Sequence, residues 1–114
     1  MYGSTVVELT DEEILGRINC LDIFSYYIGK DFKYGRAMCS PLRKDKSPSF
    51  TIFKHNSGKH FFKDFSNGDT GDCFTFLTKL YGLRRFDTYR LVDNDFQLGI
   101  STTSFLAPTK KYVG

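Results

Sequence analysis

Residues 49–64 constrain the fold of this 114-residue chain more than any other segment. Residues 49–54 (Ser-Phe-Thr-Ile-Phe-Lys) are rich in aromatic and β-branched side chains, which is typical of a strand. Asn56, Ser57 and Gly58 are turn formers, and residues 59–64 have the composition of a returning strand. The sequence therefore predicts an antiparallel β-hairpin against which the rest of the chain packs.

Short helices are expected on both sides of this hairpin, over residues 11–19, 22–29, 73–81 and 85–96. Thr10 followed by Glu13 has the form of a capping box at the start of the first helix. Asp22 is expected to cap the second helix, and Asp72 and Gly82 to bound the third. With a further strand expected over 34–39, the predicted fold class is α+β: a small antiparallel sheet flanked by short helices at both ends.

Composition is consistent with one small domain. Hydrophobic residues make up 40% of the chain and include 12 Phe and 7 Tyr, so an aromatic core is expected. We expect a domain over residues 1–99 and a linker or tail over 100–114. The chain has neither an apolar run of bilayer length nor a secretory signal pattern, and its three cysteines are scattered, which together predict a soluble, cytoplasmic protein.

Positive charge is concentrated in the middle of the sequence. Residues 30–63 carry nine Lys or Arg against two Asp, a local net charge of +7, whereas the whole chain has +3. Such segregation favours a basic face that contacts a phosphate backbone. A solvated, lysine-rich surface without a ligand is the alternative.

Two separated motifs carry a family resemblance. Residues 46–50 read Lys-Ser-Pro-Ser-Phe, and Gly71-Asp72 later leads into an aromatic helix. In this combination, over roughly residues 12–97, the chain resembles the N-terminal zinc-binding, zinc-ribbon domain of bacterial and phage DNA primases. The resemblance implies a hairpin core of zinc-ribbon type.

The residues at the family's metal positions depart from its pattern. Anchored on the two motifs, the four ligand positions fall on Ser40, Arg43, Asp64 and Asn67. Structural zinc sites use four nitrogen or sulfur donors, so we expect no zinc and no other cofactor. Arg43 and Asp64 are instead expected to form a salt bridge in the vacated site. The other candidate donors do not have the spacing of a zinc knuckle: Cys39, His55, His60 and Cys73.

The resemblance implies that the chain contacts single-stranded template DNA for a separate primase catalytic domain. Strand alternation is expected to place Lys59, Phe61 and Lys63 on one face, where lysines follow phosphates and a ring stacks on a base. Phe61 could equally belong to the core. The remaining candidate contacts lie in the adjoining strand and turn: Arg36, Arg43, Lys44 and Lys46. Ligand replacement of this kind suggests a phage-like origin, in a bacterial or phage-infected cell.

Two other functions stay open. The module could dock a replicative helicase or polymerase partner, with exposed aromatics as anchors. It could also be a small nuclease that uses Asp64, Asp69 and Asp72 to hold a metal ion. We favour neither, because Asp72 has the position of a helix cap and Asp69 that of a turn residue. No Walker-type phosphate loop is present in the sequence, so no catalytic residue is assigned.

Overall fold

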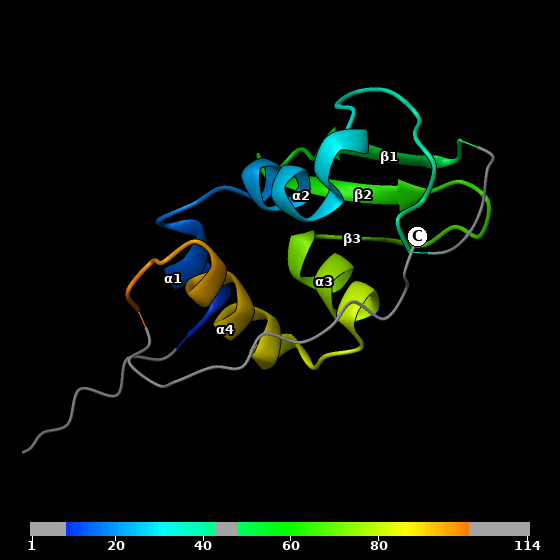
Figure 1. Ribbon diagram of the computed structural model, residues 1–114. Helices are drawn as coiled ribbons and strands as arrows, with labels where there is room; N and C mark the ends of the chain where they lie inside the picture. The colour runs from blue at the N-terminus through cyan, green and yellow to red at the C-terminus, as the bar shows by residue number, and fades with distance from the viewer. Residues whose placement is uncertain (1–8, 43–47, 101–114) are drawn as a thin grey trace, which may run out of the picture.

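The computed structural model of the chain describes residues 9–42 and 48–100. In these residues a three-stranded antiparallel sheet is combined with α-helices, which confirms the α+β class (Figure 1). The helices and strands are, in chain order, α1 (Asp11–Leu15), α2 (Cys20–Ile28), the 3-10 helix η1 (Gly29–Asp31), β1 (Phe50–Lys54), β2 (His60–Asp64), β3 (Thr70–Gly71), α3 (Cys73–Tyr81) and α4 (Arg85–Asp95).

The predicted hairpin is confirmed. Strands β1 and β2 pair in a register that sets Phe50 opposite Asp64 and Phe53 opposite Phe61. The turn between them includes Gly58 at φ 90°, a left-handed conformation that favours glycine. The short strand β3 then adds to β2 within a segment that the sequence predicts to be a loop.

Capping explains where the helices begin. The Thr10 hydroxyl accepts a hydrogen bond from the Glu13 amide, and the Asp72 carboxylate accepts one from the Thr75 amide, as the sequence predicts. The predicted cap of α2 is wrong. Asn19 caps this helix and accepts from the Asp22 amide, because the helix begins three residues earlier than a cap at Asp22 implies.

The predicted end of the first helix and the predicted strand over 34–39 are also wrong. Helix α1 ends before Gly16 instead of continuing to residue 19. The expected strand over 34–39 is reduced to an isolated bridge between Met38 and Phe50. Gly35, at φ 74°, turns the chain, and of residues 33–39 Met38 alone has a buried side chain, so one residue reaches the sheet.

The core lies between one face of the sheet and helices α2 and α3. Phe62 of β2 stacks on Phe50 of β1 with ring centroids 5.4 Å apart. Its ring also meets the edge of Phe24 from α2 and of Phe76 from α3. All four rings are fully buried. This aromatic core accounts for the high phenylalanine content and leaves the opposite face of the hairpin uncovered by α2 and α3.

The Gly71-Asp72 motif has a steric role where β3 meets α3. A Cβ atom at position 71 would lie 2.6 Å from Thr75 Cγ2, so glycine alone allows the strand to approach the first turn of the helix.

Within the described residues, no helix has both the length and the apolar character needed to cross a membrane.

Candidate nucleic-acid interface

Aromatic and basic side chains share the face of the hairpin that points away from the core. Phe53 and Phe61 are cross-strand partners with ring centroids 6.3 Å apart, and both are half-buried. Phe61 is therefore not part of the buried core, although the sequence left that possibility open. The imidazole of His55 stacks on Phe61 at 4.8 Å with an interplanar angle of 21°.

A cation borders these rings. Lys63 pairs with Thr51, and its ammonium lies 5.8 Å from the centroid of Phe65, whose side chain is 65% exposed. We call the set Phe53, His55, Phe61, Lys63 and Phe65 the outer hairpin surface. The sequence prediction missed Phe53, His55 and Phe65, and the structure pairs the first of these with Phe61.

Of the other predicted contact residues, the structure describes Lys59 and Arg36. Lys59 immediately precedes β2, and its carbonyl accepts a hydrogen bond from the His55 amide. Lys59 also lines a pocket at the turn end of the hairpin. Arg36 is exposed in the segment between η1 and Met38. Three predicted contacts, Arg43, Lys44 and Lys46, lie outside the described residues.

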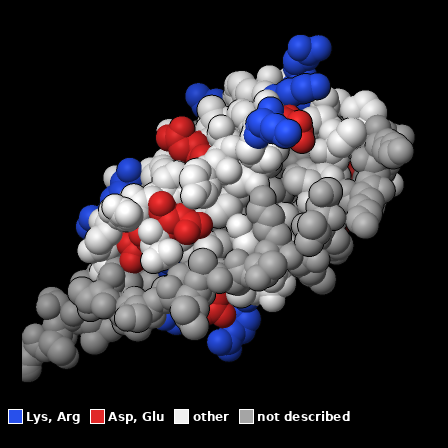
Figure 2. Space-filling model, in the orientation of Figure 1, with Lys and Arg blue, Asp and Glu red and all other residues white. Residues whose placement is uncertain are grey.

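Basic side chains of the middle segment are solvent-accessible. In the described part of residues 30–63, none of them takes part in an ion pair: Lys30, Lys33, Arg36, Lys54, Lys59 and Lys63. Figure 2 shows Lys and Arg side chains gathered over the segment that follows α2. Cations without carboxylate partners remain available to neutralise phosphates.

Three of the family's four metal positions, Ser40, Asp64 and Asn67, are described, and they lie at the end of the hairpin that is opposite the turn. The Met38–Phe50 bridge holds the Ser40 segment beside β1, and Asp64 ends β2 opposite Phe50. Ser40 and Asp64 are both buried. The Ser40 hydroxyl accepts a hydrogen bond from the Leu42 amide.

Asp64 is held by hydroxyl and amide donors. Its Oδ1 accepts from the Ser66 amide at 3.0 Å, from the Ser66 hydroxyl at 2.8 Å and from the Ser49 hydroxyl at 3.3 Å. Asn67 is exposed and hydrogen-bonds Asp69. The predicted Arg43–Asp64 salt bridge lies outside the described residues, because Arg43 does.

These residues do not fit a structural zinc ion. Ser40 and Asn67 supply a hydroxyl and an amide where the zinc ribbon uses thiolate or imidazole donors, and each is hydrogen-bonded locally. Nor do His, Cys, Asp or Glu side chains form a group of three or more that could hold a metal, as far as the described residues are concerned. The three carboxylates considered for a nuclease have different partners: Arg85 for Asp72, Lys79 for Asp69 and Ser66 for Asp64.

The arrangement defines a class of protein: a zinc-ribbon-type hairpin module whose metal positions hold residues that are poor zinc ligands. The model of the CHC2 zinc finger family, the zinc-ribbon domain of DnaG-type primases, matches residues 7–106. The chain belongs to this family, which is an accessory, primase-related DNA-binding module. No curated protein and no solved structure gives a match.

Proposed function

We propose that the chain binds single-stranded DNA through its outer hairpin surface and presents it as template to a separate primase catalytic domain. The observation that carries this proposal is the half-buried Phe61 ring, flanked by Phe53 and stacked on His55, on the face of the sheet opposite the core.

Such a surface suits single strands. Unstacked bases expose aromatic faces, and stacking on a protein ring contributes about 1–3 kcal/mol per base without sequence preference. Phe61 contacts both Phe53 and His55, so this aromatic cluster needs little ordering when a base stacks on it. Phe65, largely exposed beneath the Lys63 ammonium, offers a second ring beside a cation.

Charge supports the same assignment. Lys63 lies on the outer hairpin surface, and the exposed lysines and arginine after α2 add unpaired cations. Each phosphate neutralised releases counterions, so affinity falls steeply with salt. In the proposed role, the three aspartates considered for catalysis have other tasks: Asp72 is a helix cap, Asp69 a turn residue and Asp64 a buried hydrogen-bond acceptor.

The test is binding of a fluorescent single-stranded oligonucleotide across a salt series. Phe61→Ala is expected to weaken binding about fivefold or more at every salt concentration, through lost stacking. Lys63→Ala is expected to weaken binding and to reduce the salt slope by about 0.7.

Matched control variants lie at the N-terminal end of α4, outside the hairpin. Phe86→Ala also removes an exposed ring, and Arg84→Ala also removes one exposed positive charge. Both are expected to bind like the unchanged chain. Equal loss in test and control variants contradicts the proposed surface. Absence of DNA binding at low salt contradicts the proposed function and favours the docking of a replication protein.

A further inference from the structure

Two buried thiols from different helices are in contact. Cys20 is the first residue of α2 and Cys73 the first residue of α3, and their sulfur atoms lie 3.1 Å apart. Both are free cysteines in the structure. The pair joins positions 53 residues apart in the sequence, with the whole hairpin between them.

The two sulfurs have unequal surroundings. Hydrogen bonds from the Cys73 thiol, and from the backbone amides of Cys73 and His60, lower the pKa of Cys20 despite its burial. Burial raises the pKa of Cys73 well above its ordinary value, and the adjacent Cys20 adds to this. The hydrogen bonds therefore make Cys20 the more acidic thiol of the two.

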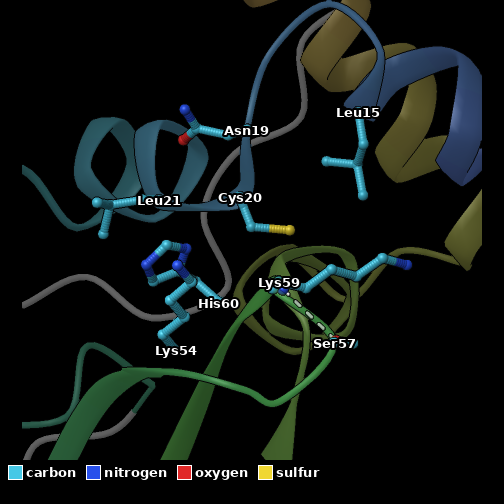
Figure 3. Close-up of a pocket in the computed structure, with 9 residues that line it drawn as sticks. Leu15, Asn19, Cys20, Leu21, Lys54, Ser57, Lys59 and His60 are labelled. Carbon is cyan, nitrogen blue, oxygen red and sulfur yellow. Dashed lines mark hydrogen bonds between the residues drawn. The ribbon is translucent and has the colours of Figure 1, made fainter.

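Cys20 lines a pocket. A pocket of about 390 Å³ lies at the turn end of the hairpin, and Cys20, Lys54 and Lys59 contribute to its walls. Figure 3 shows the Cys20 sulfur between the side chains of Leu15 and Lys59. No aspartate or glutamate lines this pocket, so its charge is positive.

We propose that Cys20 and Cys73 form a thiol–disulfide exchange site that takes small anionic disulfides through this pocket. Cys20 is the attacking sulfur, Cys73 is the resolving sulfur, and the two lysines attract the carboxylates of the incoming disulfide. This inference is independent of DNA binding by the outer hairpin surface.

The exchange balances in two steps. The Cys20 thiolate bonds to one sulfur of the small disulfide, whose S–S bond breaks and releases one thiolate. Cys73 then loses its proton, and its sulfur displaces the second small thiolate from Cys20. Two protein thiols are oxidised to one internal disulfide, and the small disulfide is reduced to two thiols. The product links the N-termini of α2 and α3, which restrains the unfolded chain.

The experiment uses the full chain with Cys39→Ser, which removes the exposed third thiol. Treated with glutathione disulfide, it is expected to lose both thiols without retaining glutathione, and peptide mapping is expected to find a Cys20–Cys73 link. The melting temperature is expected to rise by about 5 °C or more. If both thiols stay free under conditions that modify Cys39 in the unchanged chain, the proposal is overturned.

Two further variants test the order of attack and the pocket. With Cys73→Ser added, the reaction is expected to stop at a mixed disulfide on Cys20. Attachment of glutathione to Cys73 in preference to Cys20 overturns the assigned roles. Lys54→Ala and Lys59→Ala are expected to slow the reaction with glutathione disulfide about threefold, but not that with neutral hydroxyethyl disulfide. Equal slowing with both reagents, or slowing by the control Arg84→Ala, overturns the part played by the pocket lysines.

Discussion

Arg85 of α4 holds the Asp72 carboxylate with both terminal nitrogens, Nη2 donating to Oδ2 at 2.6 Å and Nη1 to Oδ1 at 3.2 Å. Asp72 is at the same time the N-cap of α3. Arg85 also donates to Asp11 of α1 at 2.7 Å, and its guanidinium lies over the Phe74 ring. One cation thus joins three helices, which makes it a stability determinant that lies away from the outer hairpin surface.

Arg85→Met is expected to reduce the free energy of unfolding by about 2–3 kcal/mol. The substitution keeps the aliphatic length but leaves the half-buried carboxylates of Asp72 and Asp11 without their cation. Urea denaturation measures the loss. Arg84→Met is the control: this neighbouring side chain is 89% exposed and pairs with Asp87 alone, so its loss is expected to cost less than about 0.5 kcal/mol. Equal effects of the two substitutions contradict a structural role for the Arg85 network.

The same contact makes stability depend on pH in the acid range. Burial by itself raises the pKa of Asp72, but hydrogen bonds and charge from Arg85, with the Thr75 amide, hold it below the ordinary 3.8. The carboxylate's contribution is therefore complete above the unfolded pKa near 3.8 and is lost as pH falls through that value toward the folded pKa. Asp72→Asn preserves a capping side chain but not the charge. Its unfolding free energy is expected to be lower at pH 7 and to fall less steeply between about pH 5 and 2.

Substitutions on the two faces of the hairpin are expected to reduce stability by different amounts. Phe62→Ala is expected to cost about 3–5 kcal/mol of unfolding free energy, since its fully buried ring packs against three other phenylalanines. Phe61→Ala, one residue earlier on the outer face, is expected to cost less than about 1.5 kcal/mol. Thermal melts of both variants provide the comparison. A loss at Phe61 as large as that at Phe62 would place Phe61 in the core and remove it from the binding surface.

Much of this fold was predictable because local chemistry decides it. Asp72 and Gly82 bound α3 as expected, since a carboxylate N-cap and a left-handed glycine act within one turn of the helix. The hairpin was predictable for the same reason: its strands and its turn are contiguous. The prediction of the α2 cap was wrong because Asn19 and Asp22 are both good N-cap residues. The burial of Cys20 and Ile23 selects the earlier one.

The candidate site was harder to predict because it depends on tertiary placement. Alternation correctly separates Phe61 from Phe62, but it does not show that Lys59, which precedes β2, lines a pocket at the turn end of the hairpin. The stacking of His55 on Phe61 depends on how the turn folds back over the sheet. The contact between Cys20 and Cys73 joins two helices that are far apart in the sequence, so no local sequence pattern predicts it.

Removal of metal is expected to leave the stability of the chain unchanged. In a zinc ribbon the metal contributes on the order of 10 kcal/mol, so chelation unfolds it. Here Asp64 is 1% exposed and is held by Ser66 and Ser49 at the family's third metal position, and the aromatic core packs beside it. We therefore expect less than about 0.1 zinc per chain by elemental analysis, and the same melting temperature with and without a strong chelator. By contrast, Asp64→Ala is expected to lower the free energy of unfolding by about 1–3 kcal/mol, because it removes the acceptor of three hydrogen bonds. Stoichiometric zinc together with unfolding on chelation would show that the chain builds its metal site from donors other than Ser40, Asp64 and Asn67.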